Sequence, residues 1–218
     1  MKKLVVIILV LFAAETVVAQ TGPAFWNEIV AYKKTDSAQP PQKNAILFVG
    51  SSSFRLWKDV SDYFPNYTII NRGVGGATLP DIIRYSYDII LPYQPKQVVI
   101  YCGENDMASG EVKADEVLLR FKTLYGIIRQ NLPQAHIHFV SMKPSPSRSN
   151  VFNEVKKGND LIKAFLEKEK KAGFIDIWNP MLDATGKPKE ELFIEDRLHM
   201  NASGYAIWKK AIQPYLVK

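Results

Sequence analysis

Short apolar runs alternate with longer amphipathic stretches through most of the chain. Five runs rich in β-branched and aromatic residues lie between turn-forming residues and predict buried strands. They are Ala45 to Val49, Tyr67 to Ile70, Val98 to Cys102, Ile137 to Ser141 and Phe174 to Trp178. Helical spacing of apolar residues predicts helices between and after these runs. They are Phe54 to Val60, Leu79 to Ile90, Val112 to Gln130, Val151 to Lys171 and Ala202 to Tyr215.

Alternation of strand and helix predicts a parallel sheet with helices on both faces. Each connecting helix returns the chain to the same edge and covers the sheet as it does so. Five strands fit a flavodoxin-like arrangement, so we expect an α/β fold, a three-layer α/β/α sandwich with a five-stranded parallel sheet. Pro92, Pro95 and Pro133 end helices, and residues 144–147 (Pro-Ser-Pro-Ser) mark a loop after the fourth strand. No internal repeat or interdomain linker is visible in this pattern.

The first nineteen residues differ from the rest of the chain. Two lysines precede an apolar run from Leu4 to Ala14, and residues 17–19 (Val-Val-Ala) offer small side chains for cleavage before Gln20. This pattern predicts a signal peptide over residues 1–19, a domain over residues 20–218, and export to the periplasm or the cell exterior. A membrane anchor is the alternative, although the apolar run is shorter than the roughly 20 residues that a spanning helix needs. We expect no stable membrane insertion of residues 20–218.

The composition excludes several classes of protein. The 218 residues are 47% hydrophobic and 23% charged, with 12 Gly and 13 Pro, which is typical of a globular chain rather than a disordered or collagen-like one. The single cysteine cannot form an internal disulfide, so packing must hold the fold. Removing residues 1–19 takes two Lys and one Glu from the 28 basic and 22 acidic residues, which leaves 26 and 21, a net charge of +5. Lysines between 156 and 171 interleave with glutamates, which predicts a solvated helix face and no nucleic-acid partner.

Small and polar residues follow three of the predicted strands. In open parallel sheets, ligands bind beyond the carboxyl ends of the strands. The first strand is followed by residues 50–53 (Gly-Ser-Ser-Ser), the second by residues 71–78 (Asn-Arg-Gly-Val-Gly-Gly-Ala-Thr) and the third by residues 103–106 (Gly-Glu-Asn-Asp). A fourth segment, residues 196–199 (Asp-Arg-Leu-His), precedes the last helix and places a carboxylate three residues before an imidazole.

These residue types can together perform nucleophilic catalysis. A serine hydroxyl is a weak nucleophile until a base removes its proton, and an imidazole is the better base when a carboxylate fixes its tautomer. His199 and Asp196 can supply these two roles. The oxyanion that develops on the attacked carbonyl needs hydrogen-bond donors already in place. Backbone N–H groups of a glycine-rich turn at Gly76 and the side-chain amide of Asn105 are suitable donors.

With these four segments in this order, the chain resembles the SGNH hydrolase superfamily, also called the GDSL esterase and lipase family. The resemblance spans nearly all of residues 20–218. It implies that Ser52 is the nucleophile and that Asp196 and His199 complete a catalytic triad. It also implies an oxyanion hole formed by the backbone N–H groups of Ser52 and Gly76 and by the side-chain amide of Asn105.

The serine triplet departs from the family pattern. The family's usual Asp before the nucleophile is Ser51 here, and the common Leu after it is Ser53. The two-residue offset from Gly50 favours Ser52, but a shifted turn would make Ser51 or Ser53 the nucleophile. Ala77 stands where many members carry a polar residue, which would alter contacts with the substrate.

Other kinds of active site fit the chain less well. An α/β-hydrolase elbow needs a second glycine where this chain has Phe54, and a dinucleotide-binding turn needs a third glycine where it has Thr78. His136 and His138 alternate on one predicted strand without a third partner, which is a poor zinc site and favours a packing role. We therefore expect no metal or organic cofactor. Cys102 ends an apolar strand and is expected to be a buried, inert thiol.

Together these observations predict an exported serine esterase that acts on a small-molecule or glycan carboxylic ester. No long apolar insertion is available as a lipase lid, which favours a short acyl group such as acetyl on a carbohydrate. Trp57, Tyr63 and Tyr101 are candidates for stacking on a sugar ring, with core packing the favoured role of Tyr101. A lysophospholipase-type lipid acylhydrolase is one alternative. A non-catalytic carbohydrate-binding module on the same fold is another, supported by Ser51. The oligomeric state cannot be predicted from this pattern.

Overall fold

Five parallel strands form one sheet in a computed structural model of the protein, which describes residues 22–218. The predicted signal peptide, residues 1–19, lies outside the described residues. The strands follow the order β2-β1-β3-β4-β5, which is the flavodoxin-like order. They are β1 (Ile46–Gly50), β2 (Ile69–Gly73), β3 (Gln97–Tyr101), β4 (His136–Val140) and β5 (Ala172–Ile175). The expected five-stranded parallel sheet is therefore confirmed.

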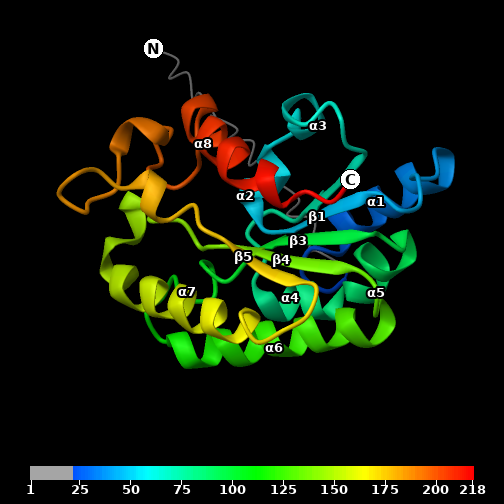
Figure 1. Cartoon of the computed structure of the whole chain (residues 1–218), viewed down its shortest axis with the longest axis horizontal. Helices are drawn as coiled ribbons and strands as arrows, with labels where there is room; N and C mark the ends of the chain where they lie inside the picture. The colour runs from blue at the N-terminus through cyan, green and yellow to red at the C-terminus, as the bar shows by residue number, and fades with distance from the viewer. Residues whose placement is uncertain (1–21) are drawn as a thin grey trace, which may run out of the picture.

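Helices cover both faces of this sheet, as Figure 1 shows. Helices α4 to α7 lie on one face, and α2, α3 and α8 lie on the other. The helices are α1 (Trp26–Ala38), α2 (Ser52–Leu56), α3 (Val60–Tyr63), α4 (Leu79–Arg84), α5 (Ser86–Ile89), α6 (Ala114–Asn131), α7 (Phe152–Leu166) and α8 (Ala202–Ile212). Short 3₁₀ turns are η1 (Leu91–Tyr93), η2 (Pro146–Val151), η3 (Asn179–Met181), η4 (Glu190–Leu192) and η5 (Gln213–Tyr215). The three-layer α/β/α sandwich is thus confirmed.

The central strands are buried on both faces, which explains their continuous apolar sequence. Every residue of β1 and β3 is buried. Successive side chains of a strand point to opposite faces. Accordingly, Leu47 and Val49 pack in the core beneath α4 to α7, while Ile46 and Phe48 pack beneath α2 and α8. A run of apolar residues is the pattern expected of a strand with helices on both sides.

The second strand differs from its prediction, because it runs through polar residues. β2 extends to Gly73 and includes Asn71 and Arg72, whereas the predicted strand ended at Ile70. Asn71 Nδ2 donates to the Phe54 carbonyl over 2.7 Å. Arg72 forms an ion pair with Asp36 of α1. β2 is an edge strand, so its polar side chains reach partners that a central strand could not offer.

Two helix predictions were inaccurate, and one helix was missed. The predicted helix from Leu79 to Ile90 is divided at Tyr85 into α4 and α5. The predicted helix from Phe54 to Val60 is replaced by two short helices, and the first begins at Ser52. Helix α1 was not predicted at all. Within residues 22–218, no helix is both long enough and apolar enough to cross a bilayer.

Candidate active site

The carboxyl ends of β1, β2 and β3 meet at one level of the sheet. Gly50 pairs in register with Gly73 of β2 and with Tyr101 of β3, so the three loops that follow begin side by side. A Cβ atom on Gly50 would lie 1.8 Å from the Tyr101 carbonyl oxygen, and one on Gly73 would lie 2.2 Å from the Arg55 nitrogen. Only glycine permits these close approaches. The two glycines therefore allow the start of α2 to pack closely against the neighbouring loops.

Ser52, the first residue of α2, meets the loop that precedes α8. Its Oγ lies 2.9 Å from His199 Nε2, and His199 Nδ1 lies 2.6 Å from Asp196 Oδ2. Asp196 Oδ1 accepts the backbone N–H groups of Leu198 and His199 over 2.9 and 2.8 Å. The loop thus closes on its own carboxylate and presents the imidazole to Ser52. The fold brings together a serine and a histidine that lie 147 positions apart in the chain.

The hydrogen bonds around Asp196 keep its carboxylate ionised. Burial acts to raise the pKa of Asp196, but the backbone and side chain of His199 and the Leu198 N–H together outweigh burial, so the pKa lies below its ordinary value. The Asp196 side chain is 43% exposed and that of His199 is 22% exposed, so solvent reaches both. An ionised carboxylate at Nδ1 leaves Nε2 free to accept the proton of the Ser52 hydroxyl.

Of the three consecutive serines, Ser52 is the one that contacts the imidazole. The Ser51 N–H donates to the Tyr101 carbonyl over 2.8 Å, and this bond continues the β1–β3 ladder into the turn. Ser51 and Ser53 are both buried. The geometry therefore places the Ser52 hydroxyl, rather than that of Ser51 or Ser53, beside His199.

Gly76 and Asn105 lie in the two neighbouring loops. Gly76 has φ 81°, in the left-handed region that favours glycine. Asn105 Nδ2 donates to the Ala77 carbonyl over 3.1 Å, which ties the amide to the same turn and leaves its second N–H for a ligand. Within the described residues, neither Gly76 nor Asn105 makes a hydrogen bond to Ser52. Their role as oxyanion donors stays a prediction that this placement supports.

A buried charged cluster lies beneath these loops, and no sequence pattern predicted it. Lys143 Nζ lies 2.5 Å from Glu104 Oε2, and the two side chains are 2% and 4% exposed. The same carboxylate accepts the hydroxyl groups of Tyr101 and Ser145, each over 2.5 Å. Each charge is therefore compensated in the interior, as buried ions require. Glu104 and Lys143 lie 39 positions apart in the chain, so no local pattern links them. A lysine in a proline-rich loop is typical of an exposed surface.

Helix α1 also reaches the site without having been predicted. Glu28 Oε2 accepts Arg55 Nε over 2.6 Å and the Gly75 N–H over 3.3 Å. Glu28 thereby joins α2 to the turn that contains Gly76. The four-residue spacing of Phe25, which packs against the core, and Ile29, which is buried in it, is the apolar signal that could have predicted this helix.

Two of the three aromatic residues considered for sugar stacking belong to the core. Trp57 and Tyr101 are buried in the cluster beneath α2 and α8. The expectation that Trp57 could stack on a sugar is therefore wrong, because no face of its indole is accessible, whereas core packing of Tyr101 is confirmed. Tyr63 is partly exposed, and its ring packs against Trp57 at 5.1 Å between centroids.

The other residues considered for chemistry lie in structural positions. Cys102 is fully buried, and burial raises the pKa of its thiol well above the ordinary value, which confirms an inert thiol. The rings of His136 and His138 stack at 6.3 Å between centroids, at the amino end of β4 and away from Ser52. Across residues 22–218, no three His, Cys, Asp or Glu side chains lie close enough together to hold a metal ion.

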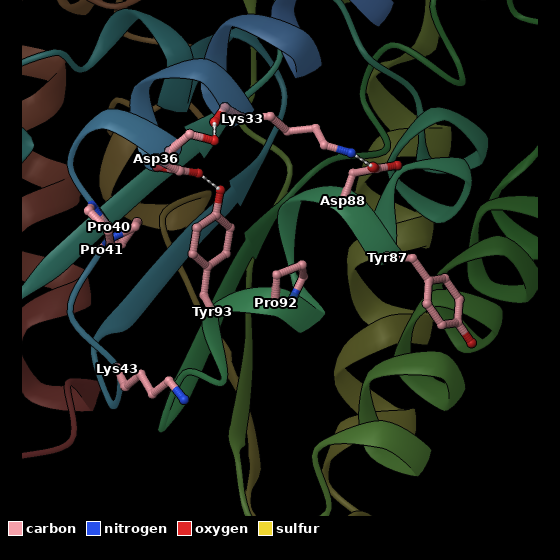
Figure 2. A pocket seen from close by; sticks show the side chains of 10 residues that line it. Lys33, Asp36, Pro40, Pro41, Lys43, Tyr87, Asp88, Pro92 and Tyr93 are labelled. Carbon is pink, nitrogen blue, oxygen red and sulfur yellow. Dashed lines mark hydrogen bonds and ion pairs between the residues drawn. The ribbon is translucent and has the colours of Figure 1, made fainter.

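A groove of about 380 Å³ lies away from these loops, beside the C-terminal half of α1 and the segment from α5 to η1 (Figure 2). Three of its four charged side chains, those of Lys33, Asp36 and Asp88, are already paired. Lys33 Nζ lies 2.7 Å from Asp88, and the Tyr93 hydroxyl donates to Asp36 over 2.5 Å. None of the predicted catalytic side chains lines this groove. We therefore place the candidate chemistry at the carboxyl edge of the sheet.

Known proteins share both a sequence pattern and a fold with this chain. A sequence model of the GDSL-like lipase/acylhydrolase family matches residues 47–207. The chain is similar to the structure of a GDSL-like lipase from Bacteroides thetaiotaomicron, with 21% identity, a TM-score of 0.72, and coverage of 85% of this chain and 95% of that one. No curated protein sequence matches the chain.

Two further solved structures share the fold. One is a protein from Streptococcus pneumonia provisionally described as a platelet activating factor, with 20% identity, a TM-score of 0.77, and coverage of 88% of this chain and 92% of that one. The other is a catalytic mutant of an acetylxylan esterase from Geobacillus stearothermophilus, with 15% identity, a TM-score of 0.61, and coverage of 80% and 94%. At these identities the likeness concerns the fold alone.

Proposed function

The chain belongs to the GDSL-like lipase/acylhydrolase family and is an ester-hydrolysing enzyme, and we propose that it is an exported serine esterase that removes a short acyl group, such as acetyl, from a carbohydrate. One observation carries the serine mechanism. Ser52 Oγ, the His199 imidazole and the Asp196 carboxylate form a continuous hydrogen-bonded series, with contacts of 2.9 and 2.6 Å.

In the proposed mechanism, Ser52 Oγ attacks the ester carbonyl carbon while His199 Nε2 takes the hydroxyl proton. Asp196 orients the imidazole and stabilises the imidazolium that forms. The N–H groups of Ser52 and Gly76 and the Asn105 amide hold the oxyanion of the tetrahedral intermediate. The C–O bond to the alcohol then breaks, and His199 returns the proton to the leaving oxygen. Water, deprotonated by His199, attacks the acyl-enzyme and regenerates Ser52.

Packing behind the oxyanion loop supports a short acyl group. Leu79, Met107 and Met142 are fully buried there. A Cβ atom on Gly103 would lie 2.9 Å from Met142 Sδ, so the backbone itself is tightly packed in this region. A long acyl chain could not enter the core by this route without displacing these side chains. An acetylxylan esterase shares the fold, which makes acetylated xylo-oligosaccharide a suitable first natural substrate to test.

Hydrolysis of p-nitrophenyl acetate, butyrate and octanoate tests this function. We expect the acetate to be the best substrate, Ser52→Ala to abolish turnover, and the neighbouring Ser51→Ala to retain it. Stoichiometric labelling of Ser52 by an organophosphonate is expected as well. Preference for the octanoate would contradict the short-acyl assignment. Absence of both turnover and labelling would contradict the serine mechanism and favour a binding module.

Export is a separate part of the proposal and rests on the pattern of residues 1–19. Expression of the full chain in a bacterial host, followed by N-terminal sequencing of the exported protein, tests it. We expect the exported chain to begin at Gln20. Retention of Met1 on a cytoplasmic product would contradict export.

A further inference from the structure

The loop between β4 and α7 is fixed to both halves of the candidate site. Ser145 Oγ and Lys143 Nζ each contact the Glu104 carboxylate over 2.5 Å, and the next residue in the chain after Glu104 is the proposed oxyanion donor Asn105. On the other side, the Ser147 N–H donates to the Arg197 carbonyl over 3.0 Å, within the turn that carries His199. The loop therefore lies between the oxyanion segment and the histidine turn.

Arg148 lies in the η2 turn of this loop, between two residues that pack against the oxyanion segment. Ser145 and Val151, three residues before and after Arg148, are both buried against residues 103–110. Ser145 reaches Glu104, and Val151 Cγ1 lies 3.8 Å from the Cβ position of Gly110.

The opposite side of the η2 turn has different neighbours. Pro146, Ser149 and Phe152 line a separate groove that also includes Arg197. Between these residues, the backbone departs from helical geometry at Arg148 (φ −111°, ψ 23°). Arg148 is not among the residues that line that groove.

The Arg148 guanidinium has no partner among residues 22–218. Its Nε is buried without a hydrogen bond, and the residue forms no ion pair there. Arg55, Arg120 and Arg197, by contrast, each pair with a carboxylate. A buried donor without a partner costs about 1–3 kcal/mol. A partly buried, unpaired guanidinium is suited to bind an anion, because its planar N–H groups can engage two oxygens at once.

The carboxylates of the adjoining oxyanion segment and histidine turn are already engaged by other groups. Glu104 is paired with Lys143, Asp106 with Arg120, and Asp196 with His199. They leave the Arg148 charge available to a ligand that enters beside the oxyanion segment.

We propose that Arg148 binds an anionic group, a carboxylate or a phosphate, on the substrate, and that the enzyme thereby selects esters carrying such a group near the scissile bond. This proposal rests on the serine-esterase function proposed above. An acetylated uronic acid would supply a carboxylate, and a lysophospholipid would supply a phosphate. Both present planar or forked oxygens that a guanidinium recognises.

Matched aryl acetates test the proposal. We would compare 4-acetoxybenzoate and 4-acetoxyphenyl phosphate with the neutral 4-acetoxyacetophenone, and monophenyl succinate with neutral phenyl pentanoate, so that the charge lies on the alcohol or the acyl side. The readout is the ratio of kcat/KM for the anionic ester to that for its neutral match. We expect a ratio of roughly 10 or more in the wild type, because a charge-assisted hydrogen bond contributes about 1.5–3 kcal/mol. The difference should lie in KM, which should be lower for the anionic ester than for its neutral match. The ratio should fall with ionic strength.

Three variants complete the design. Arg148→Gln should lower the ratio by roughly 10- to 100-fold, and Arg148→Lys should restore part of it through its charge. Arg84→Gln, at an exposed arginine in the last turn of α4, is the control and should leave the ratio unchanged. A preference for the carboxylate esters would indicate a uronic acid ester as the substrate, and a preference for the phosphate ester would indicate a lysophospholipid.

A wild-type ratio near 1 for every anionic ester would overturn the proposal, and so would an equal ratio in the wild type and Arg148→Gln. If Arg148→Gln fails to fold, the wild-type ratio and its salt dependence decide whether the proposal holds. If the wild type hydrolyses no ester, the proposed serine-esterase function fails instead. Calorimetric titration with inorganic phosphate and succinate then decides the anion site. Binding that is lost in Arg148→Gln supports it, and absent or unchanged binding overturns it.

Discussion

His199 and His138 lie at opposite ends of the same parallel sheet, one in the loop before α8 and the other within β4. His199 is partly exposed and lies between the Asp196 carboxylate and the Ser52 hydroxyl. His138 is 8% exposed, and its Nδ1 lies 2.9 Å from Gln97 Nε2, a neutral amide. Burial and the neighbouring His136 lower the pKa of His138 to about 4. The partner and the exposure, rather than the residue type, decide what each histidine does.

The surroundings of the two histidines differ in the same way. At the amino end, Gln97 holds the C-terminal segment with neutral groups, because its Nε2 donates to the Tyr215 carbonyl over 2.8 Å and its Oε1 accepts the Val217 N–H over 2.9 Å. At the carboxyl end, ionised groups occur in pairs, such as Glu104 with Lys143. Neutral hydrogen-bond partners around His138 are suited to stability near neutral pH, and an ionised partner beside His199 is suited to chemistry.

The largest expected effect comes from removing each imidazole in turn. His199→Ala should lower kcat/KM for p-nitrophenyl acetate by roughly 10⁴-fold, because the serine loses its base, with a change in unfolding free energy below about 1 kcal/mol. His138→Ala should keep kcat/KM within a few-fold and lose about 1–3 kcal/mol of stability in urea unfolding. Equal losses of activity in the two variants would break the comparison.

The next largest effect concerns the buried charges at the carboxyl end of the sheet. Lys143→Met should lower the unfolding free energy by about 3–5 kcal/mol, because it leaves the Glu104 carboxylate buried without a counter-charge. Urea unfolding measures this loss. The double variant Lys143→Met with Glu104→Gln is the matched control and should recover part of it. A loss below about 1 kcal/mol in Lys143→Met would mean that this end does not depend on charge pairing.

The proposed oxyanion donor, Asn105, should show a smaller effect that is confined to catalysis. Asn105→Ala should lower kcat by roughly 10²- to 10³-fold with little change in KM, because the amide acts on the transition state. Steady-state kinetics on p-nitrophenyl acetate measure both constants. Ser109→Ala, at an exposed position of the same loop, is the control. A rise in KM with unchanged kcat would show instead that Asn105 binds the ground state.

The smallest effect is the pH dependence of stability that His138 causes. Its folded-state pKa of about 4 lies below the ordinary value of 6.5, so the unfolded chain binds the proton more tightly. The contribution is fully present above pH 6.5 and is lost as the pH falls toward 4, to a total of about 3 kcal/mol. Urea unfolding between pH 7 and 4 measures it, and His138→Gln should flatten the curve relative to the wild type. An unchanged slope in that variant would contradict the assignment.

Much of the fold could be predicted because its signals are local. Continuous apolar runs at β1 and β3 follow from burial on both faces, and residues 50–53 and 103–106 mark the turns after them. β2 was misplaced because Asn71 and Arg72 look like loop residues until partners from other elements are known. Helix α1 was missed for a similar reason, since most of its residues are exposed and only Ile29 is buried.

The sequence by itself determined the alternation of strand and helix, the parallel sheet, and the order of the four polar segments that indicated the family. These features depend on side-chain periodicity and on turn residues, which act over a few positions. The tertiary structure alone decided which of the three serines meets His199, that Trp57 is buried, and that Glu104 pairs with Lys143. It also decided that Arg148 lacks a partner within the described residues. Contacts of this kind depend on burial and distance between segments far apart in the chain, which no local pattern encodes.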